Sequence, residues 1–349
     1  MSSPQLIQWI VDTRPLWPVP KGSPKEEMAS FQKVASKPLS FLPPTGRGSV
    51  LRYYHVKDAK LSLTSHLLKH LVVTKYAHVP WSQSVISRDE KGKPYFSCRS
   101  GEVEEFHVEF NVSHQAGIVS LIAAVGRHGV NVGTDVVCVN ERMANDYRHI
   151  DAEGFFTWVD IHGDVFAESE ISFMKCGQID DLEIDGLDTT HGFNLDKLAR
   201  CQWRNQTIEL QNGDERMKVQ SNHVIDAKLR RFYAMWCLRE TYVKMTGDAL
   251  LASWLKELEI SEVKVPASKP GLLKPESLEP GGIVKTFRMF FKGRLVTNVA
   301  MELIAIGSNF MVGGAVSIQS GAEISGLELG TWRELDIENV ILDFAEPFP

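Results

Sequence analysis

Cysteine is scarce in this chain of 349 residues and forms no recognisable motif. The five cysteines contain no CxxC pair and no nearby histidine partner; they are Cys98, Cys138, Cys176, Cys201 and Cys237. A structural zinc site and a disulfide framework are therefore not expected. The pattern fits a reducing compartment, and we expect a cytoplasmic protein.

Long apolar runs and an excess of basic residues are also missing. The longest mostly apolar stretch, Gly117–Gly126, is far shorter than the ~20 residues that span a bilayer. The first residues lack the basic and apolar regions of a secretory signal. The formal net charge is -6, so no basic field favours nucleic acid. We expect neither a membrane nor a nucleic acid as partner.

Glycine-rich phosphate loops are absent too. No Walker A motif is present, and no GxGxxG follows a predicted strand, so P-loop and Rossmann folds are not expected. The composition is that of a globular protein, with 43% hydrophobic and 23% charged residues. A chain of this length has enough apolar material for two domains or one double domain.

The same order of strand, helix, strand and strand is predicted twice along the chain. The predicted elements are Ile7–Asp12, Asp58–Ala77, Phe106–Val112 and Gly117–Val125, then Val130–Val139, Lys228–Gly247, Ile283–Lys292 and Leu295–Ile306. This repeat predicts an α+β fold of two pseudo-symmetric halves. Each half would pack a long helix on a small, mainly antiparallel sheet, and the active site would occupy the cleft between them.

The repeat suggests boundaries along the chain. We place the first half at residues 1–128, the second at 129–312 and a C-terminal extension at 313–349. The acidic and weakly periodic residues 177–221 are interpreted as an insertion or lid. Two similar halves in one chain predict a monomer.

Several local expectations complete this outline. Pro15–Pro44 is expected to be loop, and Asp58 is expected to cap the first helix. Ser113-His114 is placed just beyond its strand. Gly293-Arg294 is expected to turn a hairpin, and Trp332–Phe344 to add a strand or edge element.

The helix predicted at Lys228–Gly247 carries an unusual stripe. Trp236, Glu240 and Lys244 are four residues apart and therefore share one face. One interpretation is an ordinary Glu–Lys ion pair beside a half-buried tryptophan. The other is that Glu240 holds a metal ion while Lys244 holds an anion. Mg²⁺ needs several oxygen ligands, so the second interpretation requires another carboxylate.

Asp135 is the candidate for that second carboxylate. It lies late in a predicted strand, after Gly133-Thr134, where it could reach a cleft or merely cap a turn. Two acids and several cations would suit a substrate that carries a polyphosphate, because phosphoryl-type transfer depends on positioning and charge neutralisation.

The cations and hydroxyls come from two other segments: Arg88, Lys91, Lys93, Ser113 and His114. A basic Gly-Lys-Pro turn can bind phosphates through its charges and backbone N–H groups, or it can be a solvated hairpin. His114 could equally be structural. Ser113 and His114 are not expected to form a nucleophilic dyad, because adjacent strand residues point to opposite faces.

Four motifs occur in a characteristic order: KGKP (Lys91–Pro94), FNVSHQ (Phe110–Gln115), VGTDVV (Val132–Val137) and WCLRETYVK (Trp236–Lys244). In order and spacing the chain resembles the Sfp-type 4′-phosphopantetheinyl transferases, most of all their filamentous-fungal members. The resemblance covers roughly residues 47–306. One such motif would be a weak signal, whereas four in order are specific.

The resemblance implies Mg²⁺-dependent transfer of the 4′-phosphopantetheine arm of coenzyme A to a serine of an apo carrier protein, with release of 3′,5′-ADP. Asp135 and Glu240 would hold the metal, Mg²⁺ or Mn²⁺. Glu240 would also act as general base, and Lys244 would contact the phosphates. The implied coenzyme A contacts are Arg47, Arg88, Lys91, Gly92, Lys93, Pro94, Asn111, Val112, Ser113, His114, Asp135, Glu240 and Lys244, with Arg52 competing with Arg47.

The chain departs from the family pattern at two positions. Bacterial members often carry a third acid where this chain has Val137, so water would complete the metal shell, supported by Gln115. Arg239 stands where many relatives have lysine. Neither change removes a group that the implied reaction needs.

The resemblance also implies carrier partners, and these are typically acidic. They would be carrier domains of polyketide synthases, nonribosomal peptide synthetases, fatty-acid synthase or an aminoadipate reductase. The basic residues considered for docking are Lys228, Arg230, Arg231 and the Lys69–Lys75 region. The alternatives are a non-catalytic module that binds coenzyme A or a carrier, and a Mg²⁺-dependent nucleotide phosphotransferase, which the missing glycine-rich loop disfavours.

Overall fold

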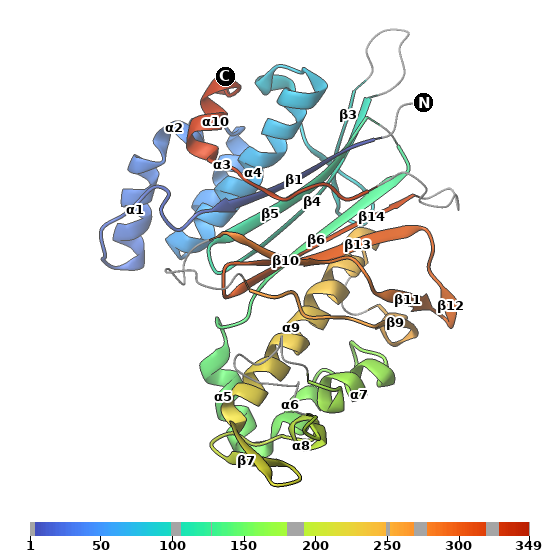
Figure 1. Ribbon diagram of the computed structural model, residues 1–349. Helices are drawn as coiled ribbons and strands as arrows, with labels where there is room; N and C mark the ends of the chain where they lie inside the picture. The colour runs from blue at the N-terminus through green and yellow to red at the C-terminus, as the bar shows by residue number, and fades with distance from the viewer. Residues whose placement is uncertain are drawn as a thin grey trace.

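The computed structural model describes residues 4–98, 106–126, 128–179, 192–248, 252–268, 278–318 and 328–348. Two sheets lie face to face between two long helices, so the centre of the molecule has four layers (Figure 1). Helix α4 (Val56–Ala77) packs on the first sheet, and helix α9 (Ser221–Thr246) packs on the second. The expected α+β fold, with a long helix on a mainly antiparallel sheet in each half, is confirmed.

The two sheets are almost entirely antiparallel. The first has the order β15 (Arg333–Glu334), β1 (Gln5–Asp12), β5 (Ile118–Val125), β4 (Phe106–Gln115), β3 (Pro94–Cys98) and β2 (Ser87–Arg88). The second has the order β10 (Pro280–Val284), β13 (Val299–Ile306), β14 (Phe310–Ile318) and β6 (Val130–Cys138). In these two sheets, the described residues form one parallel pairing, between β1 and β15.

Smaller elements surround this centre (Figure 1). Beside α4 lie α1 (Pro24–Val34), α2 (Ser36–Ser40), α3 (Pro44–Leu51) and α10 (Ile337–Val340). Around the N-terminal half of α9 lie α5 (Met143–Glu153), α6 (Phe155–Asp160), α7 (Glu168–Cys176), α8 (Asp196–Ala199) and the hairpin of β7 (Thr207–Asn212) and β8 (Glu215–Gln220). A small sheet joins β9 (Leu258–Ser261), β11 (Arg288–Phe291) and β12 (Arg294–Leu295).

The first sheet contributes side chains to two hydrophobic cores, one on each of its faces, because strand residues alternate between faces. In β1 and β5, Trp9 and Leu121 pack toward α4, whereas Ile10 and Ile122 pack toward the second sheet. Successive strand residues point to opposite faces, so a sheet covered on both sides is apolar throughout. All eight residues of β5 are buried for this reason.

Two glycines let α9 lie unusually close to the second sheet. A Cβ on Gly133 in β6 would lie 2.3 Å from the Thr241 carbonyl oxygen, and one on Gly313 in β14 would lie 2.1 Å from Thr241 Oγ1. Real side chains do not approach so closely, so only glycine fits. The two glycines therefore set the distance between α9 and Asp135, which lies opposite Gly313 and two residues after Gly133 in the β6–β14 register.

The basic residues of α9 are largely buried, which corrects the expected docking surface. The Lys228 ammonium donates to the carbonyls of Lys175, Ala199 and Cys201 at 2.6–2.7 Å, and burial lowers its pKa to about 8. The Arg231 guanidinium donates to the carbonyls of Gly177 and Gln178. These cations bind the carbonyl-rich ends of neighbouring helices. They are not available to an acidic carrier.

Several local expectations were wrong. Pro15–Pro44 is not loop: Ser23 caps α1 in a capping box with Glu26, and Pro24 occupies the first helical turn. Helix α4 begins at Val56 after His55, so Asp58 lies inside its first turn. Strand β4 continues to Gln115 and includes Ser113-His114.

The C-terminal part differs from expectation in its pairing. Lys292-Gly293 turns only the short β11–β12 hairpin, whereas β13 pairs with β10 and β14. Strand β14 runs across the expected boundary at residue 312, so the division into halves and extension stays a prediction. The edge element expected in Trp332–Phe344 is confirmed as β15.

Two further expectations concern the insertion and the membrane. Residues 192–220 contain α8 and the β7–β8 hairpin, so this part of the insertion is regular structure rather than a lid without periodicity; residues 180–191 lie outside the described residues. Across the described ranges, no helix combines the length and apolarity that a membrane span requires.

Candidate active site

The C-terminal half of α9 has one open stripe. Trp236, Glu240 and Lys244 are half-buried, while most other residues of this helix, such as Cys237 and Thr241, are fully buried. The shared face inferred from their four-residue spacing is therefore confirmed. Because the rest of the helix is packed, these three side chains are the ones that can meet a substrate.

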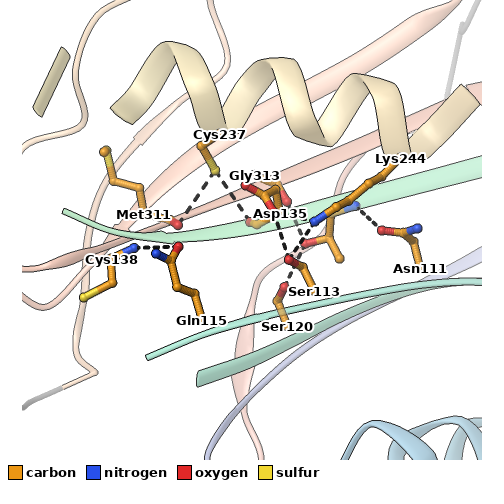
Figure 2. Close-up of polar contacts among 11 residues, drawn as sticks. Asn111, Ser113, Gln115, Ser120, Asp135, Cys138, Cys237, Lys244, Met311 and Gly313 are labelled. Carbon is orange, nitrogen blue, oxygen red and sulfur yellow. Dashed lines mark hydrogen bonds and ion pairs between the residues drawn. The ribbon is translucent and has the colours of Figure 1, made fainter. Parts of the chain in front are cut away.

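Lys244 pairs with Asp135 rather than with Glu240. Its Nζ lies 2.6 Å from Asp135 Oδ1 and 2.9 Å from Ser113 Oγ, and Ser113 donates to the same carboxylate oxygen at 2.9 Å (Figure 2). The three groups come from α9, β6 and β4. Asp135 is 5% exposed and lies opposite Gly313 within the strand, so it does not cap a turn. The expectation of a simple Glu–Lys pair on one helix is replaced by a contact between three elements.

Glu240 shares the open face of α9 with Lys244, which holds Asp135. Partial burial is the largest cause that raises the pKa of the Glu240 carboxyl; the Lys244 charge lowers it, and the negative charge of Asp135 raises it again. The Asp135 charge therefore disfavours ionisation of Glu240, and the Lys244 charge favours it. A carboxyl group whose pKa is raised is a stronger base when it is ionised.

Side chains of β4 hold Asp135 in place. Asn111 Oδ1 accepts from the Thr134 N–H at 2.9 Å, and Gln115 Oε1 accepts from the Cys138 N–H at 3.1 Å (Figure 2). Strand β6 is the edge of its sheet, so these amides satisfy backbone groups that no neighbouring strand pairs. Gln115 also donates to Glu141 at 2.7 Å. Its expected support of a metal-bound water stays a prediction.

A concave pocket of about 530 Å³ lies on the other side of β4, against α3 and α4. Its polar lining consists of three cations and three histidines with several hydroxyls: Arg52, Lys69, Arg88, His66, His70, His114, Thr45, Ser49, Ser62 and Ser65. In the described part of the chain no carboxylate forms an ion pair with Lys69 or Arg52. Cations that converge without acidic partners are suited to an anion.

At neutral pH the lysine of this pocket is mostly charged, and two of its histidines are neutral. Burial, and then the charge of Arg88, lower the pKa of Lys69 to about 8, so Lys69 stays largely protonated at neutral pH. Burial also lowers the pKa of His66 and of His70 to about 4. Ser84 Oγ donates to the Trp81 carbonyl, so the His70 Nδ1–H donates to Ser84 at 2.7 Å.

His114 links the anion pocket to the acid pair. Ser113 faces Asp135, whereas His114, the next residue, lines the pocket. Desolvation in the pocket is the first cause that lowers the pKa of His114, and the Lys244 charge is the second. The two sites therefore adjoin across β4. The opposite faces of Ser113 and His114 also agree with the expectation that they form no dyad.

The other candidate residues occupy different places. The Arg47 guanidinium donates to the Leu39 and Leu42 carbonyls, while Arg52 lines the pocket. Lys91 and Lys93 donate to carbonyls at the C-terminal end of α9. The remaining three are structural in position: Val112 packs on the α4 core, Gly92 has φ +81° in its turn, and Pro94 begins β3.

Sequence reasoning named Arg52, Arg88 and His114 for nucleotide binding but missed the part of the anion pocket that α4 supplies. His66, Lys69 and His70 are spaced i, i+3 and i+4 on α4, so they share one face. Polar and cationic residues on that face of a predicted core helix are the signal that could have found them. Lys69 was instead assigned to a docking surface, but its side chain is 8% exposed.

A second pocket, of about 450 Å³, opens on the Trp236 side of the site. Gln115 and Val137 line it next to the acid pair, and Trp158, Phe232 and Trp236 supply an aromatic wall. The open stripe of α9 therefore lies between an anion pocket and an amphipathic pocket.

Comparison with known proteins identifies the family. Residues 29–126 match the family model described as 4′-phosphopantetheinyl transferase, N-terminal. The chain is 37% identical over 346 residues to 4′-phosphopantetheinyl transferase 1 of Fusarium mangiferae, covering 99% of this chain and 97% of that protein. It is 39% identical over 351 residues to 4′-phosphopantetheinyl transferase of Aureobasidium melanogenum, covering 97% of both.

The chain belongs to the 4′-phosphopantetheinyl transferase family. It is an enzyme of the holo-[acyl-carrier-protein] synthase type. A more distant relative is 4′-phosphopantetheinyl transferase NpgA of Emericella nidulans, 31% identical over 373 residues, with 97% of this chain and 94% of that protein covered. The family and the fungal resemblance inferred from four sequence motifs are thus confirmed.

The buried histidines of this phosphopantetheinyl transferase predict a pH effect on folding. Folded His70 has a pKa of about 4 against the ordinary 6.5, so the unfolded chain binds more protons between these values. The contribution of neutral His70 to the free energy of unfolding is fully present above pH 6.5 and is lost as the pH falls toward 4. His70→Asn keeps a donor for Ser84 and removes the titration.

We expect the free energy of unfolding of His70→Asn to fall by about 1–2 kcal/mol less than that of the wild type between pH 7 and pH 5. Urea denaturation at both pH values measures this difference. His78→Asn is the matched control, because His78 is an exposed left-handed cap of the same helix. Parallel pH dependence in the wild type and His70→Asn would contradict the assignment.

Proposed function

We propose that this enzyme transfers the 4′-phosphopantetheine arm of coenzyme A to a serine of an apo carrier protein and releases 3′,5′-ADP. The observation that supports it most is the junction at β4. A carboxylate-free cationic pocket suited to a phosphorylated nucleoside adjoins two carboxylates and Lys244, which suit a pyrophosphate. The 3′-phosphate would lie among Arg52, Lys69 and Arg88.

The acid pair fits a hard divalent cation. Asp135 and Glu240 would each offer oxygen ligands, and their placement around Lys244 supports this assignment. Bound Mg²⁺ or Mn²⁺ would neutralise pyrophosphate charge and stabilise the leaving group. Among the described residues, no group of three or more potential metal ligands gathers, so water or substrate oxygens would complete the shell.

The residues of the chain have distinct roles in the proposed transfer. The carrier serine oxygen bonds to the phosphorus that carries pantetheine, and the bond from that phosphorus to the bridging oxygen breaks. Glu240 takes the serine proton, directly or through water. Lys244, held by Asp135 and Ser113, places a positive charge beside the departing phosphate of 3′,5′-ADP. The amphipathic pocket beside Trp236 accommodates the pantetheine arm.

The proposed partners are carrier domains of four classes of enzyme. We propose carrier domains of polyketide synthases, nonribosomal peptide synthetases, fatty-acid synthase or an aminoadipate reductase. The last is supported by a relative named L-aminoadipate-semialdehyde dehydrogenase-phosphopantetheinyl transferase in Schizosaccharomyces pombe, 33% identical over 140 residues. We also propose a monomer, because one chain contains two similar halves. The cysteine pattern supports a location in the cytoplasm.

Mass spectrometry of a carrier tests the function. Incubation of the enzyme with coenzyme A, Mg²⁺ and an apo carrier should add the mass of one phosphopantetheine to the carrier and release one equivalent of 3′,5′-ADP. A carrier whose acceptor serine is alanine is the control. Tight coenzyme A binding with no mass gain on any of the four carrier classes would favour a non-catalytic binding module instead.

The lining of the anion pocket predicts that Arg52 contributes more to nucleotide affinity than Arg47 does. Arg52→Ala should raise the Kd for 3′,5′-ADP by about 10-fold, because one charged hydrogen bond contributes about 1.5–3 kcal/mol. Arg47→Ala is the matched control, since the Arg47 guanidinium binds the Leu39 and Leu42 carbonyls, and its loss should leave the Kd within threefold. Calorimetry measures both. A larger effect at Arg47 would reverse the assignment.

The same titration with 5′-AMP locates the 3′-phosphate. If Arg52 contacts that phosphate, Arg52→Ala weakens 3′,5′-ADP but leaves the weaker affinity for 5′-AMP nearly unchanged. An equal loss for both nucleotides would move the 3′-phosphate away from Arg52.

A further inference from the structure

The turn that carries the KGKP motif forms several hydrogen bonds between its own residues. Asp89 Oδ1 accepts from the N–H groups of Lys91 and Lys93 at 2.9 and 2.8 Å, and the Asp89 N–H donates to the Lys93 carbonyl at 3.0 Å. Arg88 donates to the Gly92 carbonyl at 2.6 Å. The basic turn, residues 88–94, is therefore held together by its own hydrogen bonds.

The two ends of the basic turn reach different sites. Arg88 lines the anion pocket. Lys93 does not line it; its side chain is 8% exposed and its Nζ donates to the Met245 carbonyl at 2.9 Å. Met245 follows Lys244 in the chain, and it packs on Gly133 of β6. The basic turn thus connects a cation of the pocket to the residue next to Lys244.

The C-terminal end of α9 is built to receive Lys93. The last carbonyls of a helix have no partner in the helix and form its negative end, so a lysine ammonium there is stabilising. The helix ends at Gly247, which has φ +76°, and a Cβ at that position would lie 2.9 Å from Lys93 Cδ. The lysine stem therefore lies flat against a glycine that leaves room for it.

We propose that Lys93 is a positioning residue that docks the basic turn on α9 and thereby sets the distance between the anion pocket and the Lys244–Asp135 pair. The inference rests on the proposed function for the identity of the substrate. It departs from the direct coenzyme A contact that the sequence resemblance implies for this lysine. A substrate held at both ends reacts only when these two sites are correctly spaced, and a misplacement of about 1 Å can cost about 100-fold in rate.

Lys93→Met tests the proposal by separating binding from turnover. We expect kcat to fall about 10–100-fold while the Kd for 3′,5′-ADP rises less than 10-fold, because Arg52 and Lys69 lie outside the basic turn and still bind the 3′-phosphate. Lys93→Arg keeps a donor for the Met245 carbonyl and should recover most of kcat. Lys197→Met is the control, because Lys197 of α8 also donates to a backbone carbonyl, that of Glu209 in β7, and both lie away from the site.

Gly247→Ala gives an independent test, and it keeps Lys93. Its added Cβ would lie 2.9 Å from Lys93 Cδ and 3.0 Å from Lys91 Cδ, and the left-handed backbone at this position strains alanine, so the turn should undock and kcat should fall with the same small effect on the Kd. The Lys93→Met/Gly247→Ala double variant should lose no more kcat than the worse single variant, because both changes break one contact. If Lys93→Met does not fold, as judged by its circular dichroism spectrum, the Gly247→Ala and Lys93→Arg pair decides the question.

Three results would overturn the proposal. A Kd raised more than 10-fold with kcat retained would make Lys93 a ligand of the nucleotide. Unchanged kcat in Lys93→Met would remove it from the mechanism, and additive losses in the double variant would separate it from Gly247. The wild type is measured in the same assay, so failure of the proposed function appears as no transfer by any variant.

Discussion

Glu240→Gln is expected to lower kcat by about 10²–10⁴-fold, the usual contribution of a general acid–base group. The glutamine amide cannot take the serine proton, and it is a weaker metal ligand than a carboxylate. Glu240 is half-buried and has no hydrogen bond or ion pair to the described residues, so its replacement leaves no protein group unsatisfied. The thermal midpoint should therefore stay the same while the carrier mass gain is lost.

The control for this variant is Glu168→Gln, which removes an exposed carboxylate from the first turn of α7. The wild-type pH profile provides a second check. Burial raises the pKa of Glu240 in the metal-free enzyme and a bound divalent cation would lower it, so kcat/KM should fall as the pH drops through the pKa of the metal-bound carboxyl. Full activity of Glu240→Gln would exclude Glu240 as base and ligand.

Asp135→Asn is the second change with a large expected effect. Asparagine keeps the shape of the side chain but removes the charge that holds Lys244 at 2.6 Å, so both a metal ligand and the orientation of Lys244 are affected. We expect kcat to fall about 100-fold, which corresponds to about 2.7 kcal/mol of transition-state stabilisation. The metal concentration for half-maximal activity should rise at least tenfold.

Ser113→Ala separates the two effects of that change. It removes one donor to Asp135 and one partner of Lys244 but leaves the carboxylate, so it should lower kcat only modestly and leave the metal titration in place. Titration of Mg²⁺ in the transfer assay measures both variants. An Asp135→Asn enzyme with the metal dependence of the wild type would rule out Asp135 as a ligand.

The local patterns of the sequence predicted the open face of α9, whereas the acid pair as a metal site stays a prediction. The four-residue spacing of α9 places Trp236, Glu240 and Lys244 on one face whatever the helix packs against, and the neighbouring glycines leave Asp135 next to that helix. These features depend on helix and strand periods alone. They could therefore be read before any tertiary contact was known.

The anion pocket could not be predicted in the same way. Lys69 and the two histidines share a face of α4, but only packing shows that this face meets Arg52 and Arg88 from other elements. Lysine side chains on a turn also have no fixed direction in the sequence. Lys93 was expected to contact a phosphate, whereas its ammonium reaches a helix end that is 152 residues away in the chain.

Buried charge explains the error about docking. Lys228 and Arg231 look like surface residues in an amphipathic pattern, because lysine and arginine are seldom fully buried. Here the ends of α7 and α8 converge on α9 and offer several carbonyl oxygens to each cation. That arrangement depends on segments more than twenty residues away, so no window around α9 could reveal it.

The most direct measurement is a crystal structure of the enzyme with coenzyme A and Mg²⁺. We expect the 3′-phosphate among Arg52, Lys69 and Arg88, the pyrophosphate bound through one metal ion to both Asp135 and Glu240, and Lys93 still on the Met245 carbonyl. A nucleotide bound elsewhere, or a pyrophosphate that reaches only one of the two carboxylates, would contradict the account.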